Sequence, residues 1–441
     1  MKNSFYVIFT ALALGIAGYF LSGAVFLTVV FGGICYAIYR NTSFEDRDFV
    51  LRVLIAGFAV RVALAVLLHA YYYMKGFYSV SGDELLYSTK AWTMLYKWEG
   101  KPYIWALDII SATKEYGVNP FTYILAAFYK IFGFHPVISK MINCGIGTFT
   151  GWIAYLTGKE LFGNKIARIA MIVTVFFPSM VRWSVANLKD PLVNFLFLLC
   201  IYVLVKVLNR SVRVADLVIF AFALTLQYFF TQIFNFFLIV FSAAAAVFLR
   251  FFCALRSLRL KTLVIALILT GILACTCYIF CAGPAPVIDI LYICEGKQTS
   301  LALNDNAGYL LYSGDFMERL SAGRVSLSGI LDVLFRGVAY FMLSPFPWAA
   351  SSINQIMVIP QIFLWYAVLI FAVFGFARLI SAKPETALLI GSVLAVGIVI
   401  ISFVEGNIGA AFRHRDIFTP LFIIFAASTV YDLMRAEKDN V

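Results

Sequence analysis

The chain contains little charge for its length. Only 13% of its 441 residues are Asp, Glu, Lys or Arg, whereas 63% are hydrophobic and 17% are aromatic. Soluble domains carry about 25% charged residues, so this composition predicts a polytopic membrane protein. Acidic residues are the scarcer kind, and the formal net charge is +11. Because no soluble basic domain is evident, we assign the excess of Lys and Arg to cytoplasmic loops and helix anchors, and we expect no nucleic-acid partner.

Residues typical of transition-metal sites are also scarce. The three histidines are spread along the chain, so no His-based metal site can be read from the sequence. The eight cysteines lie mostly within apolar stretches. Cys275, Cys277 and Cys281 gather near one predicted helix end without a neighbouring His, and we interpret them as small apolar filler.

Long apolar runs, in contrast, are abundant. About 20 helical residues cross the hydrocarbon core of a bilayer. Runs of that kind predict an all-α fold of about twelve transmembrane helices within a single transmembrane domain, 1–441. The first two should form a retained hairpin that turns at Leu21-Ser22-Gly23, and the turn between Gln227 and Asn235 is the least distinct. The runs are 4–20, 22–39, 51–73, 137–157, 167–185, 191–208, 214–230, 231–252, 262–282, 354–378, 387–404 and 417–434.

The loops between these runs differ in charge on the two sides of the membrane. The loops of one side are short and basic, as in Arg250, Arg256 and Lys261, which is typical of the cytoplasm. The opposite side carries most of the acids in two long external loops, 74–136 and 283–353. This alternation predicts cytoplasmic termini.

Each long loop contains a segment with a helical pattern. Residues 119–133 are apolar but too short to cross a bilayer, so we expect an interfacial helix there. Residues 325–343 carry an apolar stripe with helical spacing, which predicts an amphipathic helix.

Charged residues stand at the external membrane edge in three places. A charge near a bilayer is costly, so ionisable residues there are functional candidates. The first place is Asp83-Glu84, followed by Tyr87. The second is the turn Lys189-Asp190, and the third combines Glu405 with Arg413-His414-Arg415.

Carboxylates beside cations favour a site for an anionic, membrane-resident substrate. The planar fork of Arg matches phosphate, and a carboxylate can accept a proton from an attacking hydroxyl. The catalytic candidates are Asp83, Glu84 and Asp190. Each could also hold Mg²⁺ or Mn²⁺, so a divalent cation stays an open alternative. The substrate-binding candidates are Tyr87, Lys189, Glu405, Arg413, His414 and Arg415.

Structural roles compete with these functional ones. Asp83 could cap a helix that starts near Leu85, and Lys189-Asp190 could be a solvated turn. Arg413 and Arg415 could anchor lipid headgroups. Arg61 lies inside a predicted span, where we expect it to face the helix bundle and to pair with an acid that the sequence does not identify.

The order of these features resembles the polytopic GT-C glycosyltransferases, in particular the bacterial protein mannosyltransferase and aminoarabinose transferase group. The resemblance covers about residues 50–210. It continues weakly through Pro345-Phe346-Pro347-Trp348 and Arg413-His414-Arg415. Its motifs are Gly82-Asp83-Glu84-Leu85-Leu86-Tyr87, Asn119-Pro120-Phe121, Gly158-Lys159-Glu160-Leu161-Phe162-Gly163, Phe177-Pro178-Ser179 and Asn187-Leu188-Lys189-Asp190-Pro191.

The resemblance implies a GT-C-type helical bundle in a bacterial inner membrane, with its active site facing the periplasm. It implies a polyprenyl-phosphate sugar donor and an envelope glycan, lipid or protein as acceptor. Asp83 would deprotonate or orient the acceptor, and Lys189, Arg413 and Arg415 would face the donor phosphate. The chain departs from the family at Asn119-Pro120, where many relatives have His-Pro-Pro.

Two other functions stay open. A polymerase or ligase that uses a polyprenyl-diphosphate glycan would draw on the arginines of loop 283–353. A transporter or flippase of lipid-linked sugars would place its charges at mid-membrane on broken, repeated helices. Apart from Arg52 and Arg61, the charges stand at span ends, and no internal repeat is visible.

Overall fold

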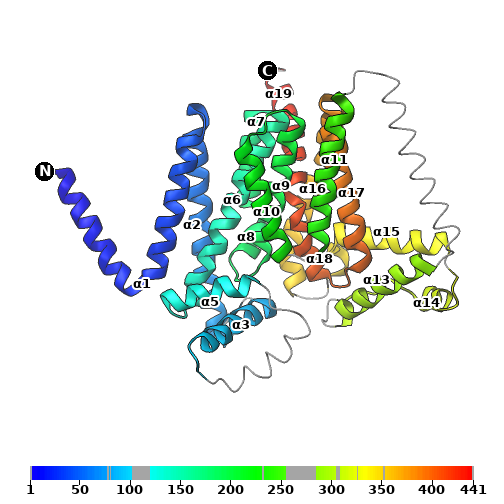
Figure 1. The fold of residues 1–441 in the computed structure, drawn as a ribbon, viewed down its shortest axis with the longest axis horizontal. Helices are drawn as coiled ribbons and strands as arrows, with labels where there is room; N and C mark the ends of the chain where they lie inside the picture. Colours follow the sequence, from blue (N-terminus) through cyan, green and yellow to red (C-terminus); the bar gives the residue numbers. More distant parts are fainter. Residues whose placement is uncertain are drawn as a thin grey trace. The chain divides into compact units, whose positions relative to one another are not determined.

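The described part of the chain is helical (Figure 1). The computed structural model describes residues 2–76, 79, 81–101, 120–230, 233–254, 285–303, 308–324, 326–350 and 353–439. Within these ranges no strand forms, and one isolated β-bridge joins Gly308 to Asn407. The predicted span 262–282, with Cys275, Cys277 and Cys281, lies outside the described residues.

Five of the helical segments are long and apolar enough to cross a membrane. Two bent helix pairs raise the number to seven if each pair is one span. The expectation of a helical protein with several membrane-length helices is therefore confirmed. The number of twelve spans and the GT-C arrangement stay predictions. The five segments are Ser22–Asn41, Phe44–Met74, Asp190–Leu208, Gln355–Ala382 and Pro384–Val404.

The chain divides into two compact units. Unit 1 comprises Met1–Leu199 and Ala221–Gln232, and unit 2 comprises Cys200–Phe220 and Ile233–Val441. Unit 1 contains α1 (Lys2–Asn41), α2 (Phe44–Met74), α3 (Gly82–Trp98), α5 (Pro120–Phe132), α6 (Pro136–Phe162), α7 (Asn164–Phe176), α8 (Pro178–Ser184) and the first half of α9 (Asp190–Leu208).

Unit 2 contains the rest of α9 and the first part of α10 (Val214–Phe230). It continues through α11 (Ile233–Ala254), α13 (Ala285–Leu303), α14 (Gly314–Ser321), α15 (Leu327–Leu343), the 3-10 turn η1 (Pro347–Ala349), α16 (Ile353–Ala382) and α17 (Pro384–Val404). It ends with α18 (Ile408–His414), the 3-10 turn η2 (Arg415–Ile417) and α19 (Thr419–Asp439).

Several predicted boundaries agree with these helices, and two do not. The predicted span 167–185 is divided between α7 and α8 at Phe177. The two helices predicted in the long loops form as α5 and α15, and the indistinct break after Gln227 falls between α10 and α11. At Leu21-Ser22-Gly23, however, the helix α1 continues without the expected loop, and its ribbon bends sharply along its length (Figure 1). The three residues lack a helix-ending proline, so the backbone hydrogen bonds can continue through them.

Glycines allow close packing of α6 in unit 1. A Cβ atom added to Gly151 would clash with Val175 of α7, and one added to Gly147 would lie 2.5 Å from Ser184 Cβ. The Gly147–Gly151 pair therefore serves helix packing, as its GxxxG spacing predicts. Pro178 follows the end of α7 at Phe176, and α8 leaves at an angle of 51°. This bend brings the chain back towards α6 at Ser184.

A crosswise layer of short helices characterises unit 2. Within this unit, α15 lies across the direction of α16 and α17 (Figure 1). Gly337 of α15 permits the crossing, because a Cβ atom there would lie 2.5 Å from the Ser402 carbonyl oxygen. The residues between α13 and α15 pack into an apolar cluster formed by Leu291, Tyr309, Leu311, Tyr312, Leu320 and Val333.

Candidate functional site

The first turn of α3 carries the acidic pair that the sequence singles out. Ser81, not Asp83, is the N-cap, and its hydroxyl accepts a hydrogen bond from the Glu84 amide at 3.2 Å. The expected helix start near Leu85 therefore moves to Gly82. Serine is as good an N-cap as aspartate. Ser81 takes that position, and Asp83 lies half-buried, one residue before a fully buried Glu84.

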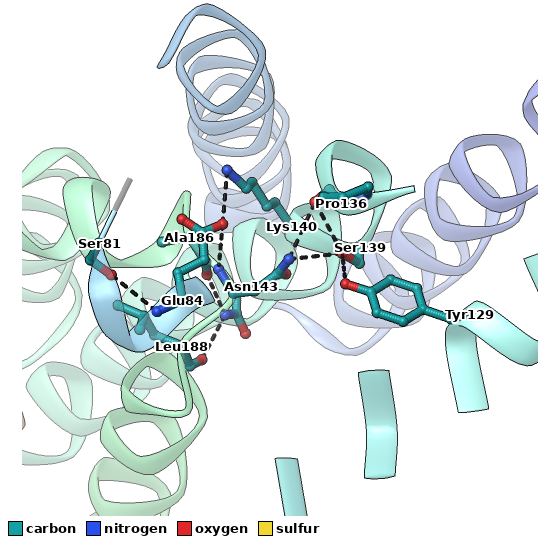
Figure 2. A network of polar contacts seen from close by, with 10 residues as sticks. Ser81, Glu84, Tyr129, Pro136, Ser139, Lys140, Asn143, Ala186 and Leu188 are labelled. Atoms are coloured by element: carbon teal, nitrogen blue, oxygen red, sulfur yellow. Dashed lines mark hydrogen bonds and ion pairs between the residues drawn. The ribbon is translucent and has the colours of Figure 1, made fainter. Parts of the chain in front are cut away.

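A buried ion pair forms the centre of this site. Lys140 Nζ of α6 lies 2.8 Å from Glu84 Oε1, and the two side chains are only 0% and 2% exposed. The same carboxylate oxygen accepts a hydrogen bond from the backbone N–H of Asn187 at 3.4 Å. Figure 2 shows the Lys140 and Glu84 side chains pointing towards each other. Burying either charge alone would be costly, so each ion keeps the other in place.

Two asparagines attach the turn before α9 to α6. Asn143 donates two hydrogen bonds of 2.7 Å, to the carbonyls of Ala186 and Leu188 (Figure 2). Asn187 donates to Ser139 Oγ at 2.9 Å. The buried Oδ1 atoms of both asparagines have no hydrogen-bond partner among the described residues. We call Glu84, Lys140, Asn143 and Asn187 the Glu84 cluster.

The other predicted residues of unit 1 lie on α3 and at the start of α9. Asp190, in the first turn of α9, is 8% exposed, and Lys189 beside it is half-buried. The ring of Tyr87 makes an edge contact with Phe121 of α5, with 6.0 Å between ring centroids. Within the described ranges no three His, Cys, Asp or Glu side chains gather to hold a metal ion.

A second polar cluster follows α17 in unit 2. Glu405 is 2% exposed, and its Oε1 accepts hydrogen bonds from the amides of Gly406 (3.1 Å) and Asn407 (3.2 Å). Its Oε2 lies 2.8 Å from His414 Nδ1, at the end of α18. The structure thus brings Glu405 and His414, two of the predicted substrate-binding residues, into contact. We call this pair the Glu405 cluster.

The two arginines beside His414 have different environments. Arg415 is 2% exposed, and its guanidinium donates to the carbonyls of Met342 (2.8 Å) and Ser344 (3.1 Å). It also lies over the Trp365 ring, at 4.8 Å from the centroid. These contacts explain Arg415 as a residue that joins α15 to α16, whereas Arg413 is half-exposed. The predicted combination of Asp83 with Arg413 and Arg415 joins residues of different units and stays a prediction.

Among the described residues Arg61 has no acidic partner, contrary to expectation. It is fully buried in α2, and it donates to Ser184 Oγ at 2.8 Å and to the Gly57 carbonyl at 3.2 Å. An acid does occur at the start of α2. Asp46 is fully buried and contacts Tyr155 Oη at 2.8 Å and Arg168 Nε at 2.6 Å.

Lys140 and Asn143 are the residues that sequence reasoning missed. Both lie inside the apolar run 137–157, where polar residues are easily read as tolerated exceptions. The available signal was the lysine itself, because an ionisable residue within an apolar run is rare and normally has a partner. A buried lysine at a membrane edge needs an acid to neutralise its charge, and for Lys140 that acid is Glu84.

Comparison with protein-family models, with curated proteins and with solved structures finds no match to this chain. The GT-C resemblance therefore rests on its short motifs alone.

Proposed function

We propose that the protein is an integral membrane glycosyltransferase that moves a sugar from a polyprenyl-phosphate donor to a hydroxyl of an envelope glycan, lipid or protein. The Glu84 cluster carries this proposal. A buried lysine–glutamate pair fixes the start of α3 against the turn before α9, and this places two further carboxylates, Asp83 and Asp190, on the elements that it joins.

The spacing of charges along α6 supports a location at a membrane edge. Lys140 lies in the Glu84 cluster, and Lys159 Nζ lies 3.9 Å from Asp46 Oδ2. Lys159 follows Lys140 by 19 positions, which corresponds to about 29 Å of helix at 1.5 Å per residue. That length matches the hydrocarbon core of a bilayer, which is about 30 Å thick. The two ionic groups of unit 1 would thus face opposite headgroup regions.

In the proposed reaction, the acceptor oxygen attacks the anomeric carbon of the donor sugar. The new bond from carbon to the acceptor oxygen forms as the bond from carbon to the phosphate oxygen breaks, and the electron pair leaves with the phosphate. Asp83 orients the acceptor hydroxyl and accepts its proton as the O–H bond breaks, and Lys189 offsets charge on the leaving phosphate. A one-step displacement inverts the anomeric centre.

The test is transfer by the purified, full-length protein in lipid nanodiscs. A labelled polyprenyl-phosphate sugar and a bacterial envelope fraction serve as donor and acceptor. We expect labelled product from the wild type and a loss of about 10²-fold or more for Asp83→Asn. Glu99→Gln changes an exposed acid in the same loop and should retain activity. Normal turnover by a well-folded Asp83→Asn protein would remove Asp83 from the reaction.

One observation favours the transporter alternative. The helix pairs Asn164–Ser184 and Ile408–Glu437 are bent by 51° and 64°, and broken helices surround substrate sites in many transporters. The same protein reconstituted in sealed proteoliposomes separates the two functions. Movement of the labelled lipid between leaflets without release of polyprenyl phosphate would support transport and contradict the transferase.

A further inference from the structure

A second buried acid lies towards the end of α6 that is farther from the Glu84 cluster. Asp46, in the first turn of α2, is 0% exposed, and its Oδ1 accepts a hydrogen bond from Arg168 Nε of α7 at 2.6 Å. Its Oδ2 accepts hydrogen bonds from Tyr155 Oη of α6 at 2.8 Å and from Ser43 Oγ at 2.9 Å. Both carboxylate oxygens therefore have donors within unit 1, and the charge of Arg168 balances that of Asp46.

Lys159 of α6 places an additional cation beside this acid. Its Nζ lies 3.9 Å from Asp46 Oδ2, which is too long for a hydrogen bond, and 5.9 Å from the centroid of the Tyr155 ring. Lys159 and Arg168 carry two positive charges against the single negative charge of Asp46, so the group keeps an excess of one positive charge. We call Asp46, Tyr155, Lys159 and Arg168 the Asp46 cluster.

Both cations of the Asp46 cluster are accessible, although their acid is not. The side chains of Lys159 and Arg168 are each 38% exposed. Nε and Nη2 of Arg168 face protein acceptors, since Nη2 contacts Asp46 and also donates to the Glu45 carbonyl at 2.8 Å. Within the described ranges, Arg168 Nη1 and Lys159 Nζ have no hydrogen-bond partner. Two exposed cations with unused N–H donors, one of them fixed by a buried carboxylate, suit a phosphate group.

The level of the Asp46 cluster along α6 favours a lipid as the source of that phosphate. The helix between Lys140 and Lys159 is about 29 Å long, and the membrane-length helix α2 begins at Phe44, beside Asp46. Lipid headgroups border the hydrocarbon core at such a level. The excess positive charge favours a headgroup with a net negative charge over a zwitterionic one.

We propose that Lys159 and Arg168 bind the phosphate of an anionic membrane lipid at this end of unit 1. The Lys159 ammonium and Arg168 Nη1 donate to the phosphate oxygens, while Asp46 holds the guanidinium from the protein side. The site uses residues of unit 1 alone and is independent of the proposed transfer reaction. Because Asp46, Tyr155 and Arg168 come from α2, α6 and α7, the complete site exists only when these helices are packed, so the bound lipid stabilises the folded protein.

Acetylation of lysines tests whether a lipid phosphate covers the Lys159 amine. The full-length protein is placed in nanodiscs of phosphatidylglycerol or of phosphatidylcholine and treated with acetic anhydride, and peptide mass spectrometry gives the rate at each lysine. Lys165 is exposed and lies outside the cluster, three positions before Arg168, so it serves as the internal reference. We expect Lys159 to react about fivefold more slowly in phosphatidylglycerol while Lys165 keeps about the same rate. An unchanged rate at Lys159, or equal slowing of both lysines, would overturn the site.

Inorganic phosphate separates a lipid from a soluble ligand in the same assay. Added to the phosphatidylcholine nanodiscs, it should leave the rate at Lys159 unchanged. Protection of Lys159 by inorganic phosphate as strong as that by phosphatidylglycerol would overturn the lipid as the ligand.

Thermal unfolding in the two lipids tests the contribution of the Lys159 charge. The wild type should unfold at a higher temperature in phosphatidylglycerol than in phosphatidylcholine, because the bound lipid favours the folded state. Lys159→Gln should lose most of this difference, whereas Lys159→Arg and the control Lys165→Gln should keep it. Arg168 is unsuitable for the test, since its loss would leave the buried Asp46 charge unpaired in any lipid. The site would be overturned by a wild type indifferent to the lipid, by a Lys159→Gln protein that keeps the full difference, or by an equal loss in Lys165→Gln.

Discussion

Glu84 and Glu405 are both buried carboxylates at a helix terminus, the first turn of α3 and the C-cap of α17, yet their cationic partners differ in burial. Glu84 faces a lysine that is fully buried, whereas Glu405 faces a histidine whose side chain is 36% exposed. A buried ammonium cannot leave its carboxylate without a large desolvation cost. A half-exposed imidazole can exchange protons with a ligand or with water while its carboxylate stays buried.

This difference in partner burial assigns a structural role to the Glu84–Lys140 pair and a chemical role to the Glu405–His414 pair. The Glu84–Lys140 pair joins α3, α6 and the turn before α9. Its two charges neutralise each other, and the carboxylate also accepts a hydrogen bond from the Asn187 backbone. In the Glu405–His414 pair the carboxylate contacts Nδ1 of a side chain that is 36% exposed. We therefore expect variants of the first pair to act on stability, and variants of the second to act on chemistry.

The largest expected effect is the loss of stability in Lys140→Met. Removing one partner of a buried ion pair leaves an unpaired buried charge, which costs about 3–5 kcal/mol of unfolding free energy. Thermal unfolding in detergent micelles measures the effect, and the double variant Glu84→Gln/Lys140→Met should recover part of it. Lys101→Met is the matched control, because Lys101 and Glu99 form an exposed pair at 2.7 Å whose loss should leave the unfolding temperature unchanged. Equal effects of the two lysine variants would show that burial does not distinguish these pairs.

A smaller loss of stability should follow when a larger side chain at Gly147 pushes α6 away from Ser184. In Gly147→Val the added carbon atoms have no space beside Ser184, so we expect a loss of about 1–3 kcal/mol. The displaced turn should also expose the Glu84 cluster, and faster hydrogen exchange at the Asn187 amide would report it. Gly145→Ala is the control in the same helix, because the nearest atom to its Cβ would be 3.7 Å away. Unchanged exchange at Asn187 in Gly147→Val would show that the helix contact and the cluster are independent.

Substitution of Glu405 by Gln should affect stability less again, by about 1 kcal/mol. The Gln carbonyl can still accept the amides of Gly406 and Asn407, and only the contact with His414 changes its character. A thermal unfolding series of Glu405→Gln beside Lys140→Met compares the two clusters directly. If Glu405→Gln lowered the free energy of unfolding as much as Lys140→Met does, the Glu405 cluster would have a structural rather than a chemical role.

Sequence patterns predict the helices better than the contacts between them. The apolar stripe of 325–343 and the short run 119–133 each form a helix because their periodicity fixes a face to bury. The acid pair at 83–84 is visible in the sequence, but which of the two is buried depends on Ser81 taking the N-cap position. That choice rotates Glu84 towards α6 and leaves Asp83 half-buried.

Long-range partners were not predictable in the same way. Lys140 follows Glu84 by 56 residues, and nothing local to either residue identifies the other. Glu405 and His414 are nine residues apart, but their contact depends on a turn and a short helix whose combined geometry has no sequence signature. Arg61 shows the opposite error, because a buried cation suggests an acid, while a serine and backbone carbonyls satisfy it here.

The smallest expected effect belongs to Tyr309→Phe, which removes only the buried phenol oxygen. That oxygen has no hydrogen-bond partner within the described ranges, and the ring keeps its stacking on Tyr340 at 4.1 Å between centroids. Deleting an unsatisfied buried polar atom removes a desolvation cost, so the unfolding temperature should stay the same or rise slightly. Transfer should fall if the phenol donates a hydrogen bond to a bound ligand, and unchanged stability with reduced turnover is the result that a ligand-binding role of Tyr309 predicts. A clear loss of stability in Tyr309→Phe would instead reveal an ordered water that satisfies the phenol, and the Glu405 cluster would then resemble the Glu84 cluster in being a closed structural network.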